Sequence, residues 1–124
     1  MVRVEKKIRV HKGGKVVEAR ALFDTSSRGS YFSKDFAEKI GYVPYEGPRE
    51  IPLAVKDEAA NLIGRTAVYM EVDGYLLPEE EAIGAVEGLR FDAIIGLNIM
   101  EKYGICVEED EIGFRHHPPT SMII

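Results

Sequence analysis

One carboxylate in this sequence stands at the end of an apolar run and is followed by three hydroxyl side chains. The stretch covers residues 21–27, and Asp24 is followed there by Thr25, Ser26 and Ser27. The apolar run predicts a buried strand that ends at the carboxylate. A carboxylate placed in this way suits acid–base chemistry, because hydrogen bonds and burial control when it holds a proton. The alternative is an ordinary Asx turn, in which Asp24 accepts a bond from one of the two serines.

A second stretch, residues 91–98, has matching features. It is another apolar run that predicts a fully buried strand, and it is interrupted at Ile94-Ile95-Gly96 by a glycine. We expect Asp92 to cap or tether a strand end. The two stretches carry most of the functional argument, and other elements must bring them together.

Those other elements follow from short alternating runs separated by turn residues. We expect Ser33 to cap a helix over residues 34–39 and a second helix over 97–103, with a loop at 44–48 and a bulge or strand end near 5–7. The expected strands cover residues 2–10, 15–24, 30–33, 49–56, 62–72, 75–77, 82–86, 91–95, 105–107 and 112–114. This pattern predicts an all-β domain with one or two short helices.

The composition sets limits on the class of protein. The chain has 124 residues, so we expect one domain over residues 1–124. A net charge of −5 argues against nucleic-acid binding, and no apolar run is long enough for a membrane span. A single cysteine, Cys106, suits a reducing cytoplasm. The acidic run at residues 79–81 is expected to be a solvated surface.

Together the two stretches resemble the retropepsin-like aspartic proteases. That family carries Asp-Thr-Gly-Ala/Ser after a core strand, and residues 24–27 read Asp-Thr-Ser-Ser here. The family then carries two hydrophobic residues and a glycine before a short helix, which corresponds to residues 94–96. The order of the intervening elements also matches, so the similarity covers about residues 15–107.

The resemblance implies a small closed β-barrel with a hairpin flap, and an aspartic endopeptidase that acts as a homodimer on peptide or protein substrates. Asp24 of each chain would meet its counterpart across a two-fold axis. Two carboxylates about 3 Å apart share one proton, so that one activates water and the other polarises the scissile carbonyl. No metal and no organic cofactor is needed.

The resemblance also implies roles for the neighbouring residues. Thr25 would bond to the partner's loop, and the Ser27 hydroxyl would donate to the ionised carboxylate. The flap tip would lie within residues 56–61 and contact substrate through Asp57, Glu58, Ala59 and Ala60.

Two alternatives stay open. Ser26 stands where the family has glycine, and the tip contains no glycine, which favours a non-catalytic retropepsin-like module for peptide binding or dimerisation. The other alternative is an unrelated small β-barrel in which Asp24 is structural.

Overall fold

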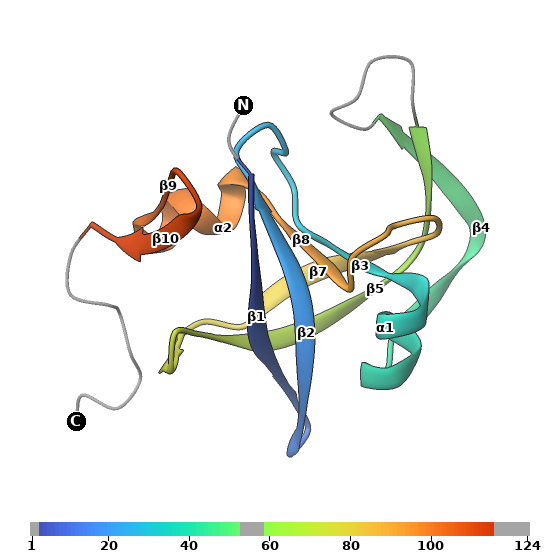
Figure 1. Ribbon diagram of the computed structural model, residues 1–124. Helices are drawn as coiled ribbons and strands as arrows, with labels where there is room; N and C mark the ends of the chain where they lie inside the picture. The colour runs from blue at the N-terminus through green and yellow to red at the C-terminus, as the bar shows by residue number, and fades with distance from the viewer. Residues whose placement is uncertain (1–2, 53–58, 116–124) are drawn as a thin grey trace.

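The computed structural model describes residues 3–52 and 59–115 as ten strands and two short helices (Figure 1). The elements in chain order are β1 (Arg3–Lys12), β2 (Lys15–Asp24), β3 (Tyr31–Ser33), α1 (Lys34–Ile40), β4 (Val43–Pro52), β5 (Ala59–Val72), β6 (Tyr75–Leu76), β7 (Glu81–Val86), β8 (Ala93–Ile95), α2 (Leu97–Tyr103), β9 (Ile105–Glu108) and β10 (Glu111–Phe114).

Six of the strands form a closed ring. The order is β1-β2-β8-β3-β7-β5, and β5 returns to β1 through the pairs Arg9–Glu71, Val10–Met70 and His11–Tyr69. Strands β4 and β6 pair with β5 outside the ring, and β9 pairs with β10 as a separate hairpin. Closure leaves no open edge among these six strands where they pair. This architecture confirms the predicted all-β fold with a closed barrel and two short helices.

The barrel interior is filled by alternate residues of the ring strands. Ile8 and Val10 point inward from β1, and Ala21 and Phe23 point inward from β2; all four are at most 2% exposed. Phe32 on β3 meets Phe36 on α1 edge to face, with ring centroids 4.9 Å apart, so that helix is joined to the same core.

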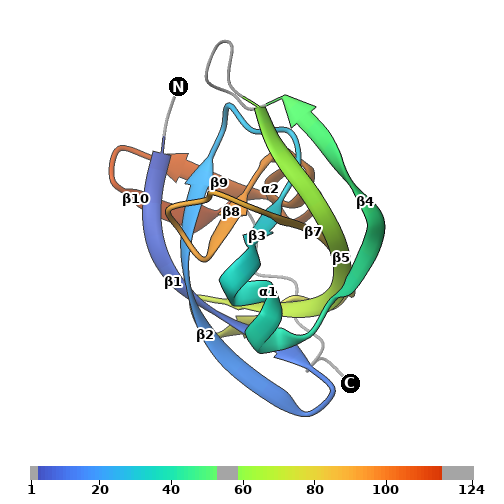
Figure 2. The same ribbon diagram turned by 90° about the vertical axis from the view of Figure 1, so that its right-hand side faces the viewer.

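The two helices lie on opposite sides of the barrel (Figures 1 and 2). The predicted cap of α1 is confirmed, since the Ser33 hydroxyl accepts a bond from the Phe36 amide at 3.1 Å. Helix α2 begins after Gly96 and ends at Gly104, whose left-handed backbone stops the helix as expected.

The predicted loop at residues 44–48 is instead part of a strand, so that expectation is wrong. Strand β4 runs from Val43 and changes register between the pairs Pro44–Gly64 and Arg49–Leu62. A proline cannot donate to a ladder, but β4 lies outside the ring, and an edge strand with an irregular register tolerates it.

The expected break near residues 5–7 is also absent, because β1 pairs with β2 without a shift from Arg3 to Lys12. Lys6 takes the inward position between Val4 and Ile8, where it is half-buried. Its ammonium pairs with Asp73 at 2.7 Å. A long aliphatic stem with a charged end can occupy such a position without interrupting the strand.

Candidate active site

Asp24 is the last residue of β2 and is only 4% exposed. Its Oδ1 atom accepts two bonds from Ser26, one from the backbone amide at 2.9 Å and one from the hydroxyl at 2.6 Å. The backbone then turns, with the Ser27 amide donating to the Asp24 carbonyl at 3.1 Å. The local sequence therefore forms a tight Asx-type turn that fixes the direction of the carboxylate.

The expected role of Ser27 differs from the observed one. We expected its hydroxyl to donate to the Asp24 carboxylate, but it donates to the Gly29 carbonyl at 2.8 Å. Ser26 makes the bond to the carboxylate in its place. A side chain two residues after the aspartate lies within reach of the carboxylate in this turn, and Ser27 instead stabilises the next part of the loop. Thr25 lies half-buried in the same turn.

The second predicted motif is directly beside the first. Strand β8 pairs with β2 in parallel, so that Leu22 is opposite Ile94 and Phe23 is opposite Ile95. Gly96 therefore follows at the strand end that also carries Asp24. The structure brings together the two stretches that the sequence singled out.

The loop after Asp24 also caps helix α2. The backbone carbonyls of Ser27 and Arg28 accept bonds from the amides of Leu97 and Asn98, at 2.8 and 3.0 Å. The first amides of a helix need acceptors from outside the helix, and Gly96 has no side chain to supply one. The carboxylate loop and the helix start therefore hold each other in place.

Ser30 also joins the carboxylate loop to the start of α2. Its hydroxyl donates to Asn98 Oδ1 at 2.8 Å and accepts the amide of Gly96 at 2.9 Å. An added Cβ at Gly96 would stand 2.6 Å from the Ser27 carbonyl oxygen and overlap the Gly29 carbonyl oxygen. Only glycine allows the backbones to approach this closely. From the sequence we assigned no role to Ser30 or Asn98, although Ser30 follows the first motif and Asn98 ends the second stretch.

Asp92 serves as the tether that the sequence predicted. Its Oδ2 atom accepts the backbone amide of Arg20 at 2.9 Å, and its carbonyl accepts the amide of Ser33 at 2.9 Å. Strand β8 is shorter than expected, because the chain bends at Asp92 to make these bonds. The expectation that residues 91–95 are fully buried is wrong for Phe91, Asp92 and Ile94, which are half-buried.

An arginine that we did not predict contacts the carboxylate. Arg3 is the cross-strand partner of Asp24 in the β1–β2 ladder. Its Nε atom lies 3.3 Å from Asp24 Oδ2, and its side chain is 42% exposed. The only sequence signal would have been the hairpin register, since a turn at residues 13–14 pairs residue 3 with residue 24.

The expectation of a solvated acidic run at residues 79–81 is wrong for Glu81, which is 8% exposed. Its carboxylate accepts bonds from the Tyr103 hydroxyl and from the Lys102 ammonium, the latter at 2.9 Å. Burial, reinforced by the bond to Glu81, raises the pKa of Tyr103. The hydrogen bond to Glu81, followed by that to Glu79, raises the pKa of Lys102. This cluster joins the end of α2 to β7. It therefore helps to fix the helix whose first turn is bonded to the carboxylate loop.

The long β4–β5 hairpin occupies the place expected for the flap. The end of β4, the start of β5 and the loop after β2 lie at the same end of the molecule in both views (Figures 1 and 2). Asp57 and Glu58 lie outside the described residues. Ala59 and Ala60 are residues of β5 and pair with Pro52 and Ile51 of β4.

Apolar side chains connect the carboxylate with this hairpin on the outer face of the barrel. Leu22 pairs with Ile94, and Ile94 pairs in turn with Tyr31; all three are half-buried. Tyr31 pairs with Gly84, and a Cβ there would meet Leu62 of β5 at 2.5 Å. The row therefore runs from beside Asp24 to the base of the hairpin.

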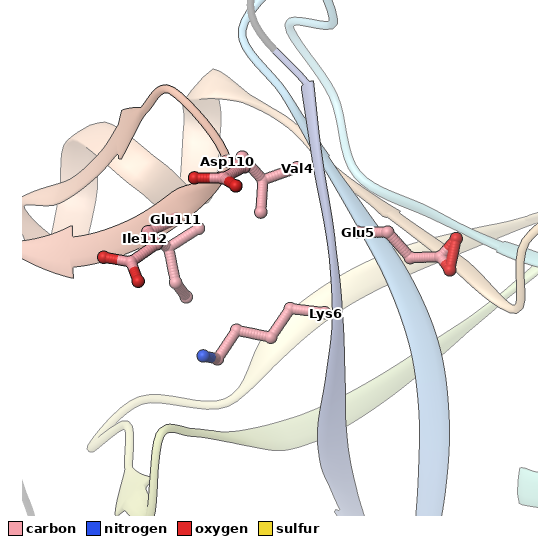
Figure 3. A pocket seen from close by; sticks show the side chains of 6 residues that line it. All are labelled: Val4, Glu5, Lys6, Asp110, Glu111 and Ile112. Atoms are coloured by element: carbon pink, nitrogen blue, oxygen red, sulfur yellow. The ribbon is translucent and has the colours of Figure 1, made fainter.

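A separate hollow of about 380 Å³ lies between β1 and the β9–β10 hairpin (Figure 3). It is lined by Val4, Glu5, Lys6, Asp110, Glu111 and Ile112, none of which is a predicted site residue. Lys6 points toward Glu111 and Ile112, whereas Glu5 points the other way. Within residues 3–52 and 59–115, no three His, Cys, Asp or Glu side chains gather as a metal site would require.

Comparison with known proteins identifies the fold. No family profile and no curated protein matches the sequence. Among solved structures, the chain is similar to the retroviral protease-like domain of Ddi1 from Leishmania major. The TM-score is 0.63 at 16% identity, over 94% of this chain and 93% of that one. The protein therefore has the retropepsin-like fold. In the part of the chain that the structure describes, no helix has the length and apolar character needed to cross a membrane.

Proposed function

We propose that the protein is an aspartic endopeptidase that acts as a homodimer. The observation that carries the proposal is the position of Asp24. It ends a core strand of a retropepsin-like barrel, and its loop is bonded to the Gly96 turn of the neighbouring parallel strand. One chain supplies one such carboxylate, so a second chain must supply the other.

The chemistry follows from two such carboxylates in contact. The charged member takes a proton from a water molecule, whose oxygen attacks the scissile carbonyl carbon. The protonated member donates its proton to the carbonyl oxygen, which gives a tetrahedral intermediate with two hydroxyl groups. The intermediate collapses as the first carboxylate passes the water proton to the leaving amine and one hydroxyl returns a proton to the second carboxylate. The two Ser26 bonds hold Oδ1 of Asp24 in one direction, which the shared-proton geometry requires.

The outer row indicates the kind of substrate. Leu22, Ile94 and Tyr31 offer an apolar surface between the carboxylate and the β4–β5 hairpin. We therefore propose cleavage of extended peptides next to apolar side chains. Burying one such side chain contributes about 1.5–3 kcal/mol to binding.

The test is digestion of a denatured protein between acid and neutral pH, with the wild-type chain, Asp24→Asn and a matched variant, Asp35→Asn. Asp35 is an exposed acid on α1. The proposal requires cleavage that is lost in Asp24→Asn, is kept in Asp35→Asn and is blocked by pepstatin. Sedimentation of the same samples must show dimers.

A second candidate is a non-catalytic module that binds peptides or dimerises. It is favoured by the near-complete burial of Asp24 beneath Arg3. Peptide binding that survives Asp24→Asn, without cleavage by the wild-type chain, would select this alternative.

A further inference from the structure

Both oxygens of the Asp24 carboxylate are engaged within the single chain. Ser26 donates twice to Oδ1, and the Arg3 guanidinium faces Oδ2. The carboxylate side chain is 6% exposed, whereas the Arg3 side chain is 42% exposed, so the arginine forms the outer layer of the contact.

Arg3 differs from the other basic residues of β1 in its partner. Lys6 pairs with Asp73, Lys7 with Glu18 and Arg9 with Glu71, which are acids of other turns and strands. Of the ion pairs described on β1, the one made by Arg3 ends on the acid of the candidate site. The partner follows from register, because Arg3 and Asp24 are the last pair of the β1–β2 ladder.

A guanidinium in this position opposes a proton-sharing pair of carboxylates. Arginine only donates hydrogen bonds and stays charged, so the guanidinium occupies the facing oxygen as a donor. The shared proton of the proposed dimer needs that region of the carboxylate for a second carboxylate, water or substrate. Since the arginine is half-exposed, the contact is weak enough to open and close.

We propose that Arg3 is an autoinhibitory cover, which closes the Asp24 carboxylate in the single chain and moves aside when the site assembles. The regulatory meaning rests on the proposed function, but the cover itself is a property of the folded chain. A second copy of this chain, bringing its own Asp24 to the same place, is the occupant that would displace the guanidinium.

The experiment measures access to the carboxylate without requiring catalysis. The full chain is treated with a water-soluble carbodiimide and glycinamide, and peptide mass spectrometry follows the modified fraction of Asp24 over time. The variants are Arg3→Gln, Arg3→Lys and the control Arg9→Gln, which removes an exposed arginine from the same strand. Asp35 serves as the internal reference, and melting curves confirm that each variant is folded.

We expect Arg3→Gln to label Asp24 roughly two- to fivefold faster, the change that loss of an exposed-arginine ion pair gives. Arg3→Lys should fall between that variant and the wild type, and Arg9→Gln should match the wild type. Equal labelling of Asp24 in all four chains would overturn the proposal.

Digestion assays separate this proposal from the proposed function. Faster labelling, with no cleavage by any variant, supports the cover and removes only the endopeptidase. Faster labelling with cleavage at or above the wild-type rate supports an inhibitory role. Faster labelling with loss of cleavage would mean that the reaction needs Arg3, and the inhibitory role would be refuted.

Discussion

Gly96→Ala tests the packing of the candidate site most directly. The backbone at Gly96 has φ −103°, which alanine adopts without strain, so the effect of this change is steric. The new Cβ would overlap the Gly29 carbonyl oxygen and stand 2.6 Å from the Ser27 carbonyl oxygen. Both obstacles are backbone atoms, which cannot turn away as a side chain could.

The magnitude follows from what must move. Overpacking of this kind costs about 1–3 kcal/mol. Separating the loop from the helix start also weakens the bonds from Leu97 to Ser27 and from Asn98 to Arg28, each contributing about 0.5–1.5 kcal/mol. The total is about 2–6 kcal/mol, a large part of the 5–15 kcal/mol that is typical of a folded domain.

The assay is thermal and urea unfolding of the purified chain. For a chain of 124 residues, about 3–5 °C is lost per kcal/mol, so the Tm should fall by roughly 6–30 °C. Gly113→Ala is the matched control, because a Cβ at Gly113 meets nothing within 4 Å among the described residues. A Gly96→Ala protein that melts within a degree or two of the Gly113→Ala protein would refute the described contact between Gly96 and the loop after Asp24.

Three further changes test the surroundings of the site. Ser30→Ala removes the acceptor of a buried backbone amide and should lower the free energy of unfolding by about 1–3 kcal/mol in urea titrations; an unchanged midpoint would contradict this bond. Ser26→Ala should alter Asp24-dependent cleavage more than Ser27→Ala does, because only the first hydroxyl reaches the carboxylate; the reverse order in kcat would count against the described turn. Burial and the bond to Glu81 raise the pKa of Tyr103, so its stabilising contribution is complete below about pH 10 and is lost as the pH rises beyond that value. Tyr103→Phe should therefore flatten the decline of stability above that pH, and parallel declines in the two proteins would show that this tyrosine has no such role.

The two central motifs could be predicted from the sequence because each is a short continuous stretch of residues. An apolar run that ends in Asp24 and another that ends in Gly96 are both visible as strings of residues, and the parallel pairing of β2 and β8 places their ends together. The helix cap at Ser33 was predictable for the same reason, since capping depends on residues three positions apart.

The features that we did not predict depend on contacts between residues that are distant in the sequence. Arg3 meets Asp24 through hairpin register, and Glu81 is buried because Tyr103 and Lys102 of a later helix reach it. Both appear in the sequence as ordinary surface charges. Pro44 appeared as a loop residue, because the sequence does not show that its strand would lie at an edge, outside the barrel.

The parallel pairing of β2 with β8 has a consequence for synthesis of the chain. The bond between Ser30 and Asn98 supports the carboxylate loop, and Asn98 is synthesised 68 residues after Ser30. Contacts of such long sequence separation form late and close slowly. A nascent or truncated chain that lacks Asn98 therefore has no supported carboxylate loop. If the assembled site cleaves peptides, it cannot cleave the unfolded segments of its own chain during synthesis.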